Sequence, residues 1–219
     1  MASVSGAAAA SAKKLVAIVT GGASGLGKAT VKYLTGKGYN VALFDLPSSE
    51  GSKLAEEIGS GIVQFRPLDI SSEDQVKEAV DSIAGQFGQL NLVVNCAGVA
   101  FAQKLGLVIN TSSIAAFEGQ AGQALYSATK GAIASMTLPL ARDYAVPGIR
   151  FVTIAPGLFE TPLMDSLPDK AKKFLGKLVL SPQRLGYPEE FAALVGHIVE
   201  NPYINGEVIR LDGGLRMSP

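Results

Sequence analysis

The chain has 219 residues, with 19 Lys and Arg against 19 Asp and Glu, so its formal net charge at neutral pH is zero. Hydrophobic residues make up 47% of the sequence and charged residues 17%, which is typical of a globular protein with one large core. The balanced charge excludes a global basic surface for nucleic acid or an anionic membrane, and no apolar run is long enough to span a bilayer.

The single cysteine and the single histidine exclude two further kinds of site. Cys96 cannot form an intrachain disulfide, which fits a reducing compartment. It follows the apolar run 92–94, so we expect an inert buried thiol rather than a nucleophile. With His197 as the only histidine, we expect no zinc site.

The first fourteen residues, MASVSGAAAASAKK, precede the first predicted strand. They are rich in Ala and Ser and lack acids, as organelle-targeting leaders do, but they contain no Arg and no clear amphipathic face. A disordered tail fits them as well. We therefore expect a flexible or targeting tail over 1–14 and a single domain over 15–219.

Apolar strands alternate with helices along the rest of the chain. Strands are predicted at 15–19, 41–44, 62–65, 90–94, 107–109, 151–154 and 208–211, and helices at 28–34, 53–58, 73–87, 124–144 and 189–199. Ser71 or Ser72 is the expected N-cap of the helix at 73–87. This alternation predicts one α/β domain with a doubly wound parallel sheet of Rossmann type.

A glycine-rich loop, TGGASGLG at 20–27, follows the first strand and opens the first helix. Gly21 permits the tight turn, Gly25 lets the backbone approach a pyrophosphate, and Gly27 allows the helix to pack closely. The phosphates then face the N-terminus of the helix. A plain strand-to-helix turn would explain these glycines alone.

Asp45 ends the next strand, where an acid binds the ribose hydroxyls of a dinucleotide, and a plain turn does not explain it. It is followed by Leu46 and Pro47, with no nearby Lys or Arg to receive a 2′-phosphate. The sequence therefore predicts NAD rather than NADP. Asp69, at the end of the third strand, is a second candidate for the adenine side, and a role in capping the helix after Ser71 explains it nearly as well.

Tyr126 and Lys130 lie four residues apart, and Ser113 precedes the tyrosine by thirteen residues. Four residues is about one helical turn, so both side chains point into one cleft. A free phenol ionises only near pH ~10, and a neighbouring ammonium favours the phenolate that accepts a proton. Ser113 supplies a hydroxyl that holds a substrate oxygen. Without further motifs, a Tyr and a Lys at this spacing are more often an exposed Lys beside a partly buried Tyr. The surrounding sequence therefore decides whether the pair is catalytic.

The loop at 20–27, Asn95–Gly98, Ser113, Tyr126 with Lys130, and Pro156–Gly157 resemble, in this order, the short-chain dehydrogenase/reductase family. The resemblance covers nearly the whole chain and is most specific to the 3-hydroxyacyl-CoA dehydrogenases of that family. It implies a mitochondrial homotetramer that uses NAD to oxidise short or branched 3-hydroxyacyl-CoA and some hydroxysteroids. It also implies a non-catalytic role in a mitochondrial tRNA-processing complex.

The resemblance assigns roles to individual residues. It places Ser113 at substrate binding, Tyr126 as the general base that also contacts substrate, and Lys130 at the nicotinamide ribose. NAD contacts are implied for Ser24, Leu26, Asp45, Asp69, Ile70, Cys96, Gly98, Phe159 and Thr161, together with Tyr126 and Lys130.

One family segment is missing between Gly98 and Leu107. In the family a helix joins these two strands, carries a catalytic Asn and packs on a neighbouring subunit, whereas here only Val99–Gly106 connects them. Asn110 lies in the following strand and cannot replace that Asn. We expect the loss to expose apolar side chains of the central strands (Leu92, Val94, Val108 and Ile109) and to leave the chain marginally stable and weakly active. A catalytically impaired NAD-binding scaffold is the alternative function.

Residues 163–185 mix apolar side chains with lysines, and family position makes them a mobile flap over the substrate. The apolar residues would line an acyl or steroid pocket and the lysines would meet the phosphates of coenzyme A. A solvated amphipathic helix is an equally good interpretation.

Overall fold

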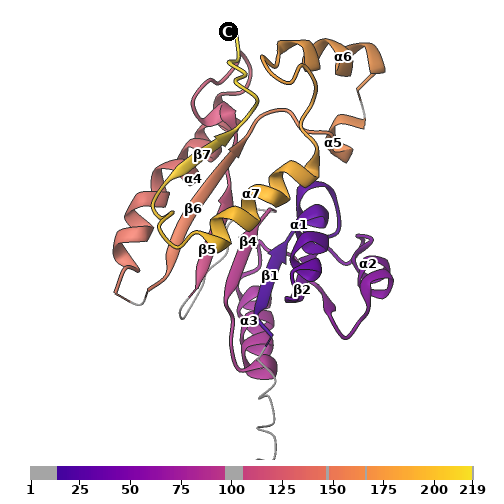
Figure 1. Cartoon of the computed structure of the whole chain (residues 1–219), viewed down its shortest axis with the longest axis vertical. Coiled ribbons are helices and arrows are strands. Elements are labelled where there is room, and N and C mark those ends of the chain that lie inside the picture. Colours follow the sequence, from indigo (N-terminus) through magenta and orange to yellow (C-terminus); the bar gives the residue numbers. More distant parts are fainter. Residues whose placement is uncertain (1–13, 97–105, 147, 166, 219) are drawn as a thin grey trace, which may run out of the picture.

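The computed structural model describes residues 14–96, 106–146, 148–165 and 167–218. It contains one parallel sheet with the strand order β3-β2-β1-β4-β5-β6-β7 and helices on both faces (Figure 1). The predicted doubly wound α/β fold is therefore confirmed. Residues 1–13 of the predicted tail, and Gly98, lie outside the described residues.

The elements follow the predicted order and most begin or end within a few residues of the expected positions. The strands are β1 (Val16–Thr20), β2 (Asn40–Asp45), β3 (Val63–Pro67), β4 (Leu92–Asn95), β5 (Leu107–Thr111), β6 (Arg150–Pro156) and β7 (Val208–Leu211). The helices are α1 (Gly25–Gly36), α2 (Gly51–Ile58), α3 (Glu73–Phe87), α4 (Ala124–Asp143), α5 (Pro162–Asp165), α6 (Asp169–Leu178) and α7 (Pro188–Glu200), with a short 3₁₀ helix η1 (Ile114–Ala116). Within the described part of the chain, none of the helices combines the length and apolarity that a bilayer crossing requires.

Helix α3 shows how local sequence sets these bounds. Its apolar residues at helical spacing, Val76, Val80 and Ile83, pack toward the sheet. Acidic residues occupy its first turn, where their negative charge interacts favourably with the helix dipole. Ser72 is the N-cap, without a side-chain cap bond, and the helix ends at Gly88 in the left-handed conformation (φ 67°).

One face of the sheet carries a continuous core beneath α1 and α7. Side chains of β1, β2, β4, β5 and β6 pack there against Val31 and Leu34 of α1 and against Phe191, Val195 and Ile198 of α7. All five of these helix residues are at most 1% exposed. This face is the support on which the strand ends, and the residues that follow them, are held in place.

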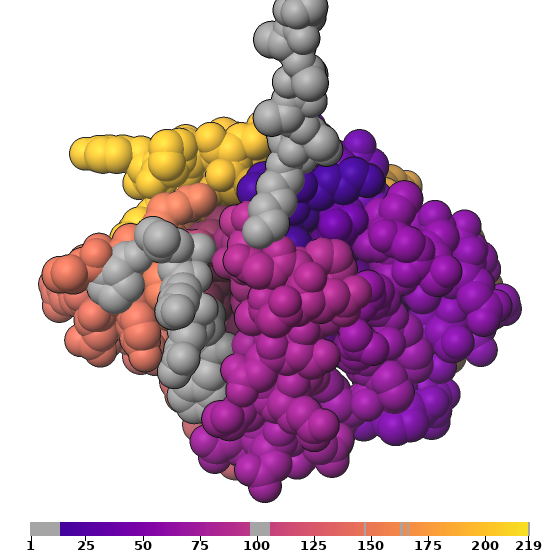
Figure 2. Space-filling model, turned by 90° about the horizontal axis from the view of Figure 1, so that it is seen from below, coloured from indigo at the N-terminus to yellow at the C-terminus, as the bar shows by residue number. Residues whose placement is uncertain are grey.

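The opposite face is covered in two separate parts. Ile83 of α3 packs with β1, β2 and Val93 of β4, whereas Ala141 of α4 packs with Val108 of β5 and Phe151 of β6. The two clusters share no residue. Figure 2 views the molecule from below, with α3 in magenta at the centre and the salmon segment near the end of α4 to one side.

The expected exposure of four central apolar side chains is wrong. Leu92 is 2% exposed, Val108 1%, and Val94 and Ile109 0%. Leu92, Val94 and Ile109 point to the face that α1 and α7 cover, because side chains alternate along a strand. Only Val108 faces the side of α3 and α4.

The connection between β4 and β5 has only eleven residues, 96–106, whereas the other connections between successive strands have 17 to 51. The predicted loss of a crossover helix concerns Val99–Gly106, and 97–105 lie outside the described residues. The two strands nevertheless pair in parallel register, with Val93 opposite Val108 and Asn95 opposite Asn110.

Candidate active site

The predicted site residues follow the carboxyl ends of six parallel strands, which meet at one edge of the sheet. The order of the strands reverses between β1 and β4, and ligands of such sheets bind at this reversal. The described candidates come after β1 (Gly21, Ser24, Gly25, Leu26 and Gly27), β2 (Asp45), β3 (Asp69 and Ile70), β4 (Cys96), β5 (Ser113, and Tyr126 with Lys130 on α4) and β6 (Phe159 and Thr161).

The glycine loop adopts the conformation that its sequence predicts. Gly21 and Gly25 have φ of 65° and 50°, which favour glycine, and the Gly21 amide donates to the Phe44 carbonyl at 2.8 Å. A Cβ at Gly27 would overlap the carbonyl oxygen of Gly21. Ser24 is the N-cap of α1 and its side chain makes no cap bond, so the positive end of the helix faces outward without a side-chain cap.

Asp45 joins the glycine loop to the end of β2. Its Oδ2 accepts the Ala23 amide at 2.9 Å and its Oδ1 accepts the Leu46 amide at 2.8 Å. A carboxylate offers about four acceptor positions, so it can still accept hydroxyl groups. The geometry thus fits a ribose at this position, next to an uncapped helix end that fits a pyrophosphate.

Asp69 and Ile70 form the turn between β3 and α3. Oδ1 of Asp69 accepts both the amide (2.9 Å) and the hydroxyl (2.8 Å) of Ser71, and the Ser71 amide, followed by its hydroxyl, lowers the pKa of Asp69. Ile70 packs against the core beside α3. The two alternatives for Asp69 are therefore compatible, since it shapes the start of α3 and remains exposed at the edge of the sheet.

Cys96 is partly buried behind the same edge. Desolvation raises the pKa of its thiol to about 12, although Thr111 and Thr30 contact the thiol and oppose this shift. The thiol therefore stays protonated at neutral pH and is a poor nucleophile. Its backbone amide donates to the Thr20 carbonyl at 3.2 Å, which ties β4 to the end of β1.

Ser113, Tyr126 and Lys130 are brought together by β5, η1 and α4. The Lys130 ammonium donates to the Thr111 carbonyl at the end of β5 (3.1 Å) and lies 5.9 Å from the centre of the Tyr126 ring. The Ser112 hydroxyl donates to the Lys130 carbonyl at 2.7 Å. Both contacts join α4 to the segment that carries Ser113.

The three side chains differ in their surroundings. Tyr126 is 48% exposed, Ser113 is partly buried, and partial burial lowers the pKa of Lys130. Ser113 Oγ accepts the Ala115 amide at 3.1 Å, which leaves its own proton free to donate. The site thus presents a hydroxyl donor and a phenol beside an ammonium.

Asn110 lies in β5, as expected, and is 4% exposed. Its Oδ1 accepts Nδ2 of Asn95 at 3.0 Å in a buried amide pair between β4 and β5. It therefore belongs to the pairing of two strands and not to the face of α4 that carries Tyr126.

The segment after β6 returns to the glycine loop. A Cβ added at Gly25 would lie 3.5 Å from Cγ2 of Thr161, so these two predicted cofactor positions are adjacent. Phe159 is 6% exposed, pairs with Gly186 in an isolated bridge, and lines a cavity of about 160 Å³ together with Arg184 and Asp212.

Comparison with known proteins identifies this arrangement. The short chain dehydrogenase family model matches residues 15–105, and the model described as enoyl-(acyl carrier protein) reductase matches residues 100–216. The chain is 46% identical to human "3-hydroxyacyl-CoA dehydrogenase type-2", over 95% of this chain and 98% of the human protein. The chain belongs to the short-chain dehydrogenase/reductase family.

Further relatives in the family carry the same name. The protein from Drosophila melanogaster is 45% identical over 94% of this chain and 99% of its own length. The crystal structure of the protein from Mycobacterium avium superposes with a TM-score of 0.84 at 33% identity, covering 94% of this chain and 97% of that chain. This membership makes the chain an oxidoreductase whose fold binds NAD or NADP.

The relatives also show how many residues this chain lacks. The match to the human protein extends over 256 residues, but 95% of this 219-residue chain is about 208, so about 48 positions have no counterpart here. The predicted loss of an internal segment is thus consistent with the length of the relatives as well as with the short β4–β5 connection.

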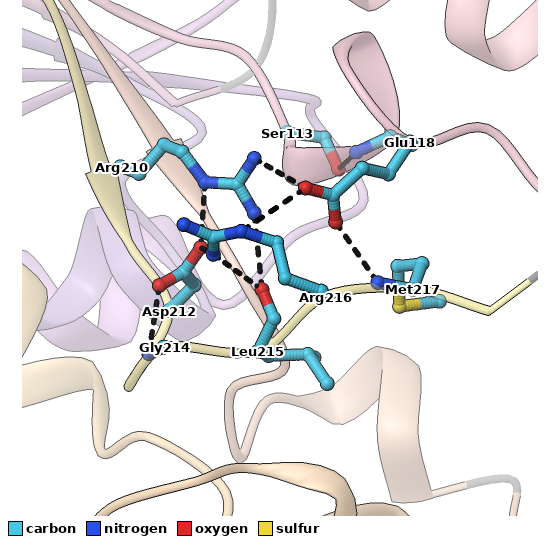
Figure 3. A network of polar contacts seen from close by, with 9 residues as sticks. Ser113, Glu118, Arg210, Asp212, Gly214, Leu215, Arg216 and Met217 are labelled. Carbon is cyan, nitrogen blue, oxygen red and sulfur yellow. Dashed lines mark hydrogen bonds and ion pairs between the residues drawn. The ribbon is translucent and has the colours of Figure 1, made fainter.

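Sequence reasoning missed a polar network beside Ser113. Glu118, two residues after η1, accepts hydrogen bonds from Arg210 of β7 and from the amide of Met217 (Figure 3). Arg210 and Met217 lie 92 and 99 positions after Glu118 in the chain, and no local sequence pattern predicts contacts over such separations.

Proposed function

We propose that this chain oxidises the 3-hydroxyl group of a 3-hydroxyacyl-CoA thioester to a 3-oxo group, with NAD as the hydride acceptor. The observation that carries the proposal is the Lys130 ammonium, bonded to Thr111 and 5.9 Å from the ring of a half-exposed Tyr126. The name shared by the relatives from human and Drosophila, 3-hydroxyacyl-CoA dehydrogenase type-2, supports the substrate class.

In this mechanism the Ser113 hydroxyl donates a hydrogen bond to the substrate oxygen and holds that oxygen beside the phenol. Tyr126 in its phenolate form accepts the hydroxyl proton, and the charge of Lys130 stabilises that phenolate. Bound NAD would supply the hydride acceptor for the carbon that carries the hydroxyl group. Lys130 keeps its position because Thr111 holds its ammonium and Ser112 holds its backbone carbonyl.

The choice of NAD rests on Asp45. Its carboxylate, fixed by the Ala23 and Leu46 amides, would repel a 2′-phosphate and would accept ribose hydroxyls. Gly21, Ser24, Gly25, Leu26 and Gly27 would hold the pyrophosphate, with Asp69, Ile70 and Cys96 toward the adenosine and Phe159 and Thr161 toward the nicotinamide.

The substrate side is proposed for α6 and the segments around it. Phe174 and Leu178, one turn apart on α6, are 62% and 40% exposed, and Lys173 and Lys177 are exposed on the same helix. This pattern suits an acyl chain and the phosphates of coenzyme A. Hydroxysteroids are proposed as secondary substrates, because the same apolar side chains suit a steroid skeleton.

We also propose a homotetramer in the mitochondrial matrix. Exposed apolar side chains support an assembly, since Leu125 is 80% and Leu180 71% exposed. Location is tested by imaging the full chain with a carboxyl-terminal tag, and assembly by sizing with light scattering.

The test of the oxidation is Tyr126→Phe, assayed with NAD and 3-hydroxybutyryl-CoA, with Tyr203→Phe as the matched control because Tyr203 is 97% exposed on a loop. We expect Tyr126→Phe to lower kcat by roughly 10²–10⁴-fold and to leave NAD binding nearly unchanged. An unchanged kcat in Tyr126→Phe refutes the role of the tyrosine.

A second candidate function is an NAD-holding scaffold in a tRNA-processing complex. Two observations together support it: roughly 48 positions of the relatives are missing from this chain, and the glycine loop is intact. A purified chain that binds NAD, oxidises neither acyl-CoA nor steroid, and retains tRNA-processing subunits would select it. Robust turnover by the isolated chain would exclude a purely structural role.

A further inference from the structure

The carboxyl-terminal segment, from Arg210 onward, contacts the loop that follows Ser113. Figure 3 shows Arg210 at the start of this segment and Met217 near its end, both directed at Glu118. Glu118 Oε1 accepts Arg210 Nη1 at 2.7 Å, and Oε2 accepts the Met217 amide at 2.9 Å. Both oxygens of one carboxylate are thus used to fasten the end of the chain.

Arg210 is itself held on several sides. Its Nε donates to Asp212 Oδ2 at 2.7 Å and its Nη2 donates to the Leu215 carbonyl at 3.0 Å. The Arg210 and Glu118 side chains are 22% and 20% exposed. A guanidinium with this many partners and little exposure has one orientation, so it holds the carboxylate of Glu118 in one place.

Glu118 is connected to Ser113 by a single turn of 3₁₀ helix. The Glu118 amide donates to the Ile114 carbonyl (3.1 Å), and the Ala115 amide donates to Ser113 Oγ (3.1 Å). A shift of Glu118 therefore moves η1, and with it the bond that orients the Ser113 hydroxyl.

The next residue after Glu118 touches the helix that carries the tyrosine. A Cβ at Gly119 would overlap the Ser127 side chain, so the backbone at Gly119 lies directly on α4 beside Tyr126. The carboxylate of Glu118 is thus one residue from the contact between the serine loop and the tyrosine helix.

We propose that Glu118 and Arg210 are positioning residues that fix the Ser113 loop against α4, and thereby the distance between the serine hydroxyl and the tyrosine phenol. The inference rests on the proposed oxidation for its catalytic consequence. Neither residue is assigned contact with substrate or cofactor. Misplacement of a reacting group by about 1 Å can lower a rate roughly 10²-fold, so such a clamp has a large effect on turnover.

The experiment compares Glu118→Ala, Glu118→Gln, Arg210→Met and the double variant Glu118→Ala/Arg210→Met in the full chain. Lys37→Met and Glu200→Ala serve as matched controls, because Lys37 and Glu200 form an ion pair of 3.2 Å at the carboxyl-terminal ends of α1 and α7, away from the serine loop. For each protein kcat, the KM for the acyl-CoA and the dissociation constant for NAD are measured.

We expect Glu118→Ala and Arg210→Met each to lower kcat by roughly 10- to 100-fold, with NAD affinity unchanged, because the glycine loop lies elsewhere on the sheet. Glu118→Gln keeps an acceptor for the Met217 amide and should lose less. The double variant should lose less than the two single losses combined, since the two side chains share the contact between Glu118 and Arg210. Equal kcat in all variants, or additive losses in the double variant, overturns the proposal.

A second measurement does not depend on turnover. The chain contains no Trp, so Phe117→Trp, at a half-exposed position with Arg210 5.5 Å from the ring centre, places one fluorophore on the loop. We expect Glu118→Ala in this background to increase acrylamide quenching, and Glu200→Ala to leave it unchanged. If wild type shows no oxidation, the proposed function fails while the quenching still tests the clamp, and unchanged quenching in Glu118→Ala overturns the clamp even in an active enzyme.

Discussion

The two faces of the sheet are covered very differently, although the same strands form both. In the described chain, five of the thirteen residues of α7 are buried, whereas two of the twenty residues of α4 are buried. The core under α1 and α7 is one cluster, and the core under α3 and α4 is divided. Burial of apolar surface therefore stabilises the first face much more than the second.

This difference matters because the first face supports the glycine loop and the second carries Tyr126 and Lys130. Besides its small apolar cluster, α4 makes polar contacts with the sheet side, such as Ser112 to Lys130 at 2.7 Å and the buried hydroxyl pair of Thr137 and Thr153 at 2.6 Å. We therefore expect destabilising substitutions to impair the placement of Tyr126 and Lys130 more than they impair cofactor binding.

The largest expected effect comes from removing apolar volume on the two faces. Phe191 of α7 is 0% exposed, so Phe191→Ala should lower the free energy of unfolding by about 3–5 kcal/mol. Leu138 of α4 is 46% exposed, so Leu138→Ala should cost less than about 1 kcal/mol. Urea denaturation measures both, and equal losses would show that the faces do not differ in this way.

Arg150 tests the connection between β6 and the end of α7. Its guanidinium donates to the carbonyls of Ile198, Asn201 and Ile204 at 2.8–3.1 Å. Arg150→Met leaves these carbonyls without that donor, and we expect a loss of about 1–3 kcal/mol in urea denaturation. Arg142→Met, on the exposed side of the last turn of α4, is the matched control and should change little.

The cofactor side can be altered without touching α4. Asp45→Ala combined with Leu46→Arg should reduce the preference for NAD over NADP by about tenfold or more, or ~1.4 kcal/mol, because the repulsive carboxylate is gone. Asp45→Asn keeps an acceptor for the Ala23 amide and separates the charge from the loop geometry. A wild-type preference for NADP in steady-state kinetics would contradict the role given to Asp45.

The smallest expected effect is a pH dependence from Glu190 at the start of α7. The Arg184 guanidinium and the Tyr187 amide lower the pKa of Glu190 from 4.5 to about 2. A depressed pKa stabilises the folded state above pH 4.5, and this contribution is lost as the pH falls toward 2. The Glu190 side chain is 43% exposed and therefore screened, so we expect less than about 1 kcal/mol.

Urea midpoints at pH 6 and pH 3 for wild type and Glu190→Gln measure this contribution. The wild type should lose slightly more stability on acidification than the variant. A larger loss in the variant would reverse the sign and contradict the assignment.

Sequence periodicity predicted the order of strands and helices because the apolar residues of each element recur at the spacing typical of that element, as in α3. It could not assign the faces of the central strands. Leu92 and Val94 alternate with Val93, and only the assembled sheet shows which of them meets α7 and which meets α3.

The glycine loop and the Tyr126–Lys130 pair could be found from sequence, since each is a short motif on one element. The bond from Asp45 to the Ala23 amide and the contact of Lys130 with Thr111 required the strands to be placed side by side. The Glu118–Arg210 pair could not be predicted from the sequence for the same reason.

Hydrogen–deuterium exchange of the apo chain and of the chain with NAD tests the unequal faces most directly. We predict that backbone amides of α7 exchange slowest and that amides of α4 exchange faster by roughly tenfold or more, because fewer buried contacts must break to open that helix. NAD should protect the segments around Gly21–Gly27 and Asp45 and leave α4 the faster-exchanging helix. Exchange of α4 as slow as that of α7 in the apo chain would contradict the account.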